Sequence, residues 1–236
     1  NVVRGIQAAF IDIGLEQNAF LYLGDKMDVT EGQSILVQIS KDARGTKGPT
    51  ATREVTLPGK YVVLLPYASY IGVSRKITDK LERERLVKAC EAAKPEGVGI
   101  VIRTAATGVS EELLAADIAE LVAAWRVLVA REKLAKAPAL LRRELDLAIR
   151  IARDYLRPDL TEIMIDDLAI YKRVEELMKN VPQAKNVKLK MYQGLEDIFS
   201  YCGQTEAVAS ISDRQVDLPN GGYIVFDYTE AMTVID

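Results

Sequence analysis

Short apolar stretches, cut by glycine and polar clusters, dominate the first quarter of the chain. Runs such as "QAAFIDIG" and "SILVQIS" are rich in β-branched and aromatic residues and extend for only a few positions. Patterning of this kind is typical of strands in a small barrel or sandwich. Strands are therefore predicted over residues 7–14, 18–24, 34–40, 52–57 and 60–66.

Helical periodicity replaces this pattern beyond residue 78. Thr78 or Asp79 is suited to cap a helix over residues 80–93, and Ser110, followed by two glutamates, is suited to open a long helix. The apolar residues of that long helix recur at a spacing that places them on one face. They are Leu114, Ile118, Leu121, Trp125 and Leu128. A further long helix is predicted over residues 138–156.

Strands and helices alternate along the rest of the chain. Helices are predicted over residues 167–180 and within "LEDIFSYC" and "TEAVASI". Strands are predicted over residues 98–106, 162–166, 186–192, 214–218 and 223–228, and in "AMTVID". No internal repeat or low-complexity segment interrupts this order. The pattern predicts an α+β multi-domain chain.

The composition excludes several kinds of chemistry. The chain of 236 residues has no histidine, which removes Ser-His-Asp and Cys-His catalysis and His-ligated zinc. Cys90 and Cys202 lie far apart and indicate free thiols in a reducing compartment, so a cytoplasmic location is expected. No apolar run reaches the ~18 residues of a membrane span. A net charge of −3 gives no overall basic field, although local patches are still able to bind nucleic acid.

An arginine ends the apolar strand that precedes the long helix. The stretch "RTAATG" begins with Arg103 and Thr104 and leads to the helix start at Ser110. A guanidinium fork, a hydroxyl and the free N–H groups of a helix start together suit a phosphate. A salt-bridged arginine at a strand end is the alternative, and the residues alone favour it.

A basic loop, "KDARGTKGPTATR", joins two strands of the barrel-like region. Lys41, Arg44 and Lys47 in this loop are suited to follow a phosphate backbone. Phe10 and Phe20 lie on neighbouring predicted strands and are suited to stack on bases. The alternative is a solvated hairpin loop with two core phenylalanines, and the residues do not decide between the two.

Carboxylates end two of the predicted strands, in "MIDD" and in "VID". Carboxylates at strand ends are common Mg²⁺ ligands in phosphoryl-transfer enzymes. Asp166 is equally suited to cap the helix that follows it. Asp236 has no helix after it in this sequence. One carboxylate does not hold Mg²⁺ alone, because the ion needs further protein or substrate oxygens.

These stretches together resemble a known family. "GIQAAFIDIG", "NAFL", "ARGTKGP", "LPGKYVVLLP", "GVSRKI", "IRTAA", "RDYLRPDL" and "PNGGYIVFDYTEAMTVID" are similar, in order and spacing, to the catalytic half of the ribonuclease E/G family. The resemblance runs from residue 5 to residue 236. It implies a Mg²⁺-dependent endoribonuclease of rRNA processing and mRNA decay. It also implies a preference for single-stranded, AU-rich RNA with 5′-monophosphate ends.

The resemblance also implies a division into four parts. Residues 1–52 correspond to an S1-type OB-fold RNA-binding domain that lacks its beginning, and residues 53–147 to a 5′-sensor region. Residues 148–212 correspond to a ribonuclease H-like subdomain without its own active site, and residues 213–236 to the start of a DNase I-like catalytic subdomain.

Site residues are carried over onto the matching positions. The RNA-binding surface falls on Phe10, Phe20 and Lys47, with Lys41 beside them, and the 5′-phosphate pocket on Arg103, Thr104, Gly59 and Val63. Asp236 corresponds to a catalytic, Mg²⁺-binding aspartate whose fellow ligands are expected downstream. The zinc link of the family, which joins subunits, is also expected downstream. A homo-oligomer is therefore expected only for a longer protein.

Two departures from the family pattern bear on activity. The sequence begins with Asn1 within a predicted strand and supplies one metal ligand, so we expect a part of a longer protein that does not cleave RNA alone. A non-catalytic RNA-binding and 5′-end-sensing module is the alternative. The segment around residues 25–28 is shorter than is usual in the family, which predicts a chain break or a true deletion there.

Overall fold

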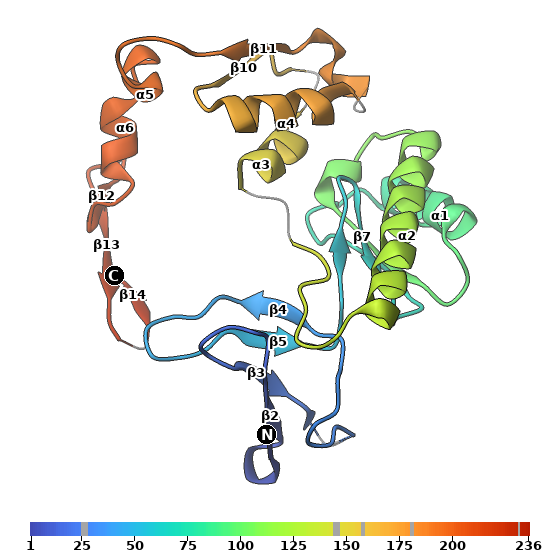
Figure 1. Ribbon diagram of the computed structural model, residues 1–236. Helices are drawn as coiled ribbons and strands as arrows, with labels where there is room; N and C mark the ends of the chain where they lie inside the picture. Colours follow the sequence, from blue (N-terminus) through green and yellow to red (C-terminus); the bar gives the residue numbers. More distant parts are fainter. Residues whose placement is uncertain (25–27, 144–146, 157–158, 180–181, 231) are drawn as a thin grey trace. The chain divides into compact units, whose positions relative to one another are not determined.

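The computed structural model describes residues 1–24, 28–143, 147–156, 159–179, 182–230 and 232–236 (Figure 1). The expected break near residues 25–28 falls largely outside these ranges. The chain forms two compact units, Asn1–Leu145 and Asp146–Asp236, which are treated separately. Six α-helices and four sheets lie within the described residues, which confirms a mixed α+β fold with several sheets. The finer division into four named domains stays a prediction.

A five-stranded sheet begins the first unit. Its spatial order is β1 (Val2–Val3), β2 (Ala8–Ile11), β3 (Ala19–Tyr22), β5 (Thr50–Thr52) and β4 (Gln38–Lys41). Side chains alternate between the two faces of a strand, and one face here is apolar. Ala19, Leu21 and Ala51 are buried on that face, and residues such as Ile35 and Val37 pack against them.

Two strand predictions in this region were wrong in their bounds. The run 34–40 becomes a strand only from Gln38, because its first apolar residues fill the core from a loop. The run 52–57 contains no strand across its middle. Thr52 Oγ1 accepts a hydrogen bond from the Glu54 N–H at 3.1 Å, and this local turn ends β5. The next strand, β6 (Leu57–Pro58), belongs to another sheet.

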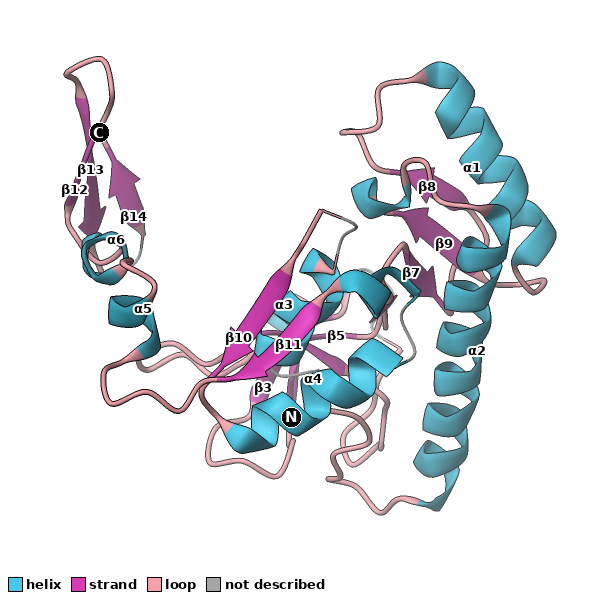
Figure 2. Cartoon of the chain, turned by 90° about the horizontal axis from the view of Figure 1, so that it is seen from above, coloured by secondary structure: helices cyan, strands magenta, loops and turns pink. Residues whose placement is uncertain are grey.

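A four-stranded sheet with two helices completes the first unit. The strands run in the order β6, β7 (Val62–Leu65), β9 (Gly99–Ile102) and β8 (Ile71–Val73), and the sequence reasoning missed β8. Helices α1 (Lys80–Ala93) and α2 (Glu111–Leu134) pack against this sheet and against each other (Figure 2). Their buried residues share one core with the strands, including Leu64, Leu86, Ile100, Leu114 and Ile118.

Both helix starts agree with the predicted caps. The Asp79 carboxylate accepts the N–H groups of Leu81 and Glu82, so Asp79 rather than Thr78 caps α1. Ser110 Oγ accepts the N–H of Leu113 at the start of α2. These acceptors satisfy donors that a helix start leaves without partners.

The helix predicted over residues 138–156 is wrong in its first part. Helix α3 covers only Leu147–Tyr155, and residues 138–143 have no regular structure. Leu140 is 72% exposed, so the segment lacks an apolar surface to pack on, and propensity alone does not hold a short helix. Arg131 instead donates to the Leu141 carbonyl at 3.2 Å, which ties the segment to the end of α2.

The second unit contains a small βαβ arrangement followed by a loosely packed end. Strand β10 (Glu162–Ile165) pairs in parallel with β11 (Lys188–Met191), and α4 (Leu168–Lys179) connects them. Short helices α5 (Ile198–Tyr201) and α6 (Thr205–Ser210) follow. The last sheet is antiparallel and contains β12 (Gln215–Asp217), β13 (Tyr223–Tyr228) and β14 (Thr233–Ile235). No described residue after Val187 is buried.

Candidate nucleic-acid interface

The outer face of the five-stranded sheet carries a row of aligned side chains. Phe10 on β2 pairs with Phe20 on β3, and Phe20 pairs with Thr50 on β5. Lys41 on β4 lies opposite the same Thr50 because the register of β4 shifts between Ile39 and Lys41. Residues paired directly across strands project from the same face of a sheet. The row therefore runs across four strands, with two aromatic rings at one end and a cation at the other.

The two rings are accessible. Phe10 is 38% exposed, Phe20 is half-buried, and their ring centroids lie 5.9 Å apart in an edge-to-face arrangement. Small and aliphatic residues fill the core on the opposite face of these strands. The interpretation of both rings as core residues is therefore not supported by their position, and their surfaces are available to stack on a base.

The basic loop continues from the cationic end of this row. Arg44 and Lys47 form an isolated antiparallel bridge, with N–H to O distances of 3.0 and 3.1 Å in the two directions. Gly45 between them has a φ of 58°, a left-handed conformation that suits glycine. Two like charges directly opposite each other are unfavourable on their own. An RNA phosphate at this turn would relieve that repulsion.

Arg103 follows β9 and lies against the turn that contains Gly59. Its Nη1 donates to the carbonyl oxygens of Gly59 and Lys60, the latter at 3.3 Å. Its backbone N–H donates to the Tyr61 carbonyl at 2.8 Å. The structure thus brings together two of the four residues expected to bind a 5′-phosphate, Arg103 and Gly59.

The other two predicted residues have different surroundings. Thr104 Oγ1 shares a hydrogen bond of 2.9 Å with Ser74 Oγ. Val63 lies within β7, where it pairs with Val101 of β9. Their roles stay predictions.

Sequence reasoning missed Asp117, which organises the same turn from the other side. Its carboxylate accepts the backbone N–H groups of Lys60, Tyr61 and Val62 at 3.1, 2.8 and 3.0 Å. A Cβ added to Gly59 would lie 2.6 Å from Asp117 Oδ2, so only glycine fits there. A signal was present, because Asp117 interrupts the apolar face that Leu114, Ile118 and Leu121 form.

The segment after Thr104 is fixed by an ion pair. Glu82 Oε1 accepts the Gly108 N–H at 2.8 Å, and Arg85 Nε donates to Glu82 Oε2 at 2.7 Å. Arg85 also donates to the Val109 carbonyl at 2.9 Å. The hydrogen bond from Arg85, followed by that from Gly108, lowers the pKa of Glu82 to about 2. This pair joins α1 to the loop that carries the predicted phosphate ligands.

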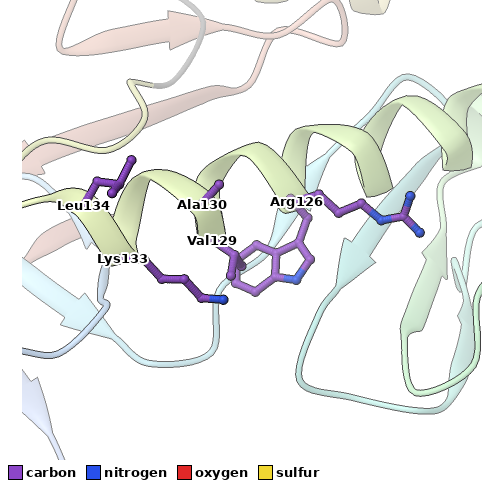
Figure 3. A pocket seen from close by; sticks show the side chains of 6 residues that line it. Arg126, Val129, Ala130, Lys133 and Leu134 are labelled. Carbon is purple, nitrogen blue, oxygen red and sulfur yellow. The ribbon is translucent and has the colours of Figure 1, made fainter.

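A groove on the surface of α2 lies apart from all these residues. It has a volume of about 450 Å³ and is lined by one helix alone (Figure 3), through Trp125, Arg126, Val129, Ala130, Lys133 and Leu134. The Trp125 ring meets the Tyr67 ring edge-on at 5.5 Å. None of the residues predicted to bind RNA or phosphate lines this groove.

Asp236 follows β14 and is exposed. Its backbone N–H donates to the Val225 carbonyl at 3.0 Å. Asp227 on the neighbouring strand is paired with Arg214, at 2.9 Å for one of its two contacts. No group of three or more His, Cys, Asp or Glu within the described residues is placed to hold a metal ion. The residues present do not by themselves fit a Mg²⁺ site.

Of the adjacent aspartates Asp166 and Asp167, one has a structural role. Asp167 Oδ1 accepts the Ile170 N–H at 2.8 Å and caps the start of α4. The cap is therefore Asp167, and not Asp166 as the sequence suggested. Asp166 is exposed.

The fold and these surfaces define a mixed α+β protein whose candidate site suits a single-stranded nucleic acid. A model of the Ribonuclease E/G family matches residues 56–236, and the chain belongs to this family. It is 38% identical over 256 residues to Ribonuclease G of Escherichia coli, covering 100% of the chain and 52% of that protein. It is 36% identical over 255 residues to Ribonuclease E of a Nostoc species, covering 100% of the chain and 37% of that protein.

The chain spans about half the length, or less, of these relatives. No helix among the described residues has the length and apolar character that crossing a membrane requires.

Proposed function

We propose that the chain is the RNA-binding and 5′-end-sensing part of an endoribonuclease of RNA processing and decay. The names of its relatives, Ribonuclease G and Ribonuclease E, support the reaction class. The aligned row of Phe10, Phe20 and Lys41 on the outer sheet face is the observation that carries the proposal for RNA.

Each part of the row has a chemical task in this proposal. The rings of Phe10 and Phe20 stack on unpaired bases, which selects single strands because the bases of a duplex already stack on one another. Lys41, Arg44 and Lys47 follow the phosphates. Stacking requires no particular base, so this face binds many sequences.

Arg103 is proposed to bind the 5′-monophosphate, with Thr104 and the backbone near Val63. Gly59 contributes by its place beside Arg103, since its own N–H donates to the Val62 carbonyl at 2.8 Å. A guanidinium is a strong donor to a phosphate because both groups are charged and their geometries match. The support is that Arg103 is held beside the Gly59 turn, at the carboxyl end of β9. In this proposal, the five-stranded sheet stacks on the bases, and Arg103 beside the four-stranded sheet recognises the 5′ end.

Mg²⁺-dependent phosphodiester hydrolysis is proposed only for a protein that supplies metal ligands in addition to Asp236. Asp236 provides one carboxylate, whereas Mg²⁺ requires several oxygen ligands in a near-octahedral arrangement. The 236-residue chain is accordingly expected to bind RNA without Mg²⁺-dependent cleavage. A non-catalytic RNA-binding module is the second candidate function, and the exposed row on the outer sheet face favours it.

Salt dependence tests the proposal. Replacing Lys41, Arg44 and Lys47 with Gln removes up to three phosphate contacts. The slope of log K against log salt for a single-stranded RNA should then fall by about 2, because each contact contributes roughly 0.7. A control replaces two cations elsewhere, Arg126 and Lys133 in the groove on α2, with Gln and should leave the slope unchanged. Equal slopes for the loop variant and the wild type would overturn the proposed surface.

Cleavage is measured on the same RNA with a fluorescent label. Ordinary Mg²⁺-dependent turnover by the purified chain would contradict the binding-module account. It would direct attention back to Asp166 and Asp167 as metal ligands.

A further inference from the structure

Tyr22 lies on the same outer face as Phe20, two residues further along β3. The strand alternates, with Ala19 and Leu21 buried on the core side and Phe20 and Tyr22 on the other. Tyr22 is 61% exposed, more than Phe10 at 38%. Two residues along a strand span about 7 Å, so the Tyr22 ring is rooted next to that of Phe20.

The cross-strand neighbour of Tyr22 is small. Ala8 pairs with Tyr22, just as Phe10 pairs with Phe20 one step further along the ladder. The side chain of Ala8 is a single methyl group and provides no ring for Tyr22 to pack on. Ala8 is itself fully buried, and 61% of Tyr22 stays exposed to solvent.

Gln7 holds the Tyr22 hydroxyl. Tyr22 Oη donates to Gln7 Oε1 at 3.1 Å. Gln7 has a φ of 51° and is the one non-glycine residue of positive φ among those described. That conformation is unfavourable for a residue with a Cβ, and such strain often marks a functional position.

The backbone around Gln7 keeps it in this conformation. Its N–H donates to the Arg4 carbonyl at 3.1 Å, and its carbonyl accepts the Leu23 N–H at 2.8 Å. A side chain that is already held by a hydrogen bond loses less conformational freedom when a ligand binds. The ring of Tyr22 is thus exposed and pre-positioned at once.

We infer that Tyr22 is a third base-stacking position, which takes the nucleotide next to the one on Phe20 in single-stranded RNA. The inference rests on the proposed RNA-binding role of this sheet face and extends it by one nucleotide. The recognised chemistry is the flat face of an unpaired base, which any of the four bases supplies. Gln7 is a positioning residue that sets the ring through its hydroxyl.

The experiment measures binding of the full chain to a short fluorescent single-stranded RNA. Tyr22→Ala should raise Kd by about 5- to 100-fold, because stacking on one aromatic residue contributes that much per base. Tyr22→Phe keeps the ring and should stay within about 3-fold of the wild type. Tyr70→Ala is the control. Tyr70 is 60% exposed, close to Tyr22 at 61%, but it directly precedes β8 of the four-stranded sheet and is not part of the proposed RNA surface.

An abasic scan of the same RNA assigns the position. At one position of the RNA, removal of the base should weaken binding to the wild-type protein. The same removal should not weaken binding to Tyr22→Ala any further. A Kd for Tyr22→Ala equal to that of the wild type would overturn the inference. If Phe20→Ala weakens binding in that case, only the third position fails; if Phe20→Ala is also without effect, the proposed RNA surface fails with it.

Discussion

The outer sheet face and the turn beside Arg103 are both candidate RNA contacts, and different forces hold them in place. Strand pairing, with one shift in register before Lys41, aligns Phe10, Phe20 and Lys41, and none of the three belongs to the buried core of this sheet. The turn at Gly59 depends on hydrogen bonds from Arg103 and to Asp117, which come from segments distant in sequence. Substitutions on the sheet face should therefore change RNA affinity without changing the free energy of unfolding. Substitutions at the turn should change both.

The largest effect on the free energy of unfolding is expected for Asp117→Ala. Three backbone N–H groups lose their common acceptor, and each partly buried donor left without one costs about 1 kcal/mol or more, so roughly 3 kcal/mol in total. Urea unfolding measures this loss. Glu120→Ala, on the exposed side of the same helix, is the control and should change stability by less than about 0.5 kcal/mol. A similar loss in both variants would show that the Gly59 turn does not depend on Asp117.

A smaller loss of stability is expected for Arg103→Lys, together with a loss of selectivity. The change keeps the charge but removes the fork that reaches the Gly59 carbonyl, so a destabilisation of about 1 kcal/mol is expected. The preference for 5′-monophosphate over 5′-hydroxyl RNA should fall by about 10-fold or more. Competition binding with the two RNA ends measures it. An unchanged preference would return Arg103 to a purely structural role.

The Glu82–Arg85 pair gives a pH-dependent effect that is smaller still. The pKa of Glu82 is lowered from 4.5 to about 2, first by the hydrogen bond from Arg85 and then by that from Gly108. The unfolded state therefore binds more protons between these values, and stability is lost as pH falls through this window. Glu82→Gln should flatten that part of the pH profile. A wild-type profile that is already flat between pH 4.5 and 2 would contradict the ion pair.

The sequence predicted the sheet face better than the turn. Alternation in "NAFLYLG" places Phe20 and Tyr22 on one face, because strand geometry is local and has a period of two. The caps at Asp79 and Ser110 were also readable, since a cap acts within three residues. Asp117 and the Gly59 turn lie more than fifty positions apart, so no local pattern pairs them.

The secondary-structure elements that were predicted wrongly or missed also depend on contacts between segments distant in sequence. Residues 138–143 carry helical periodicity, yet the exposed Leu140 has no partner surface, and tertiary contacts decide the outcome. Strand β8 was missed because "IGV" is three residues long and gains its place only by pairing with β9. Asp236 was recognisable by resemblance, but its partner ligands are not found among the described residues.

The central claim is that the outer sheet face binds single-stranded RNA through side chains that the fold does not need. Phe20→Ala tests it most directly, with RNA affinity and the free energy of unfolding measured on one preparation. The expected result is a loss of affinity of about 5- to 100-fold, with a change in stability below about 1 kcal/mol. Unchanged affinity, or a loss of affinity that merely follows unfolding, would contradict the account.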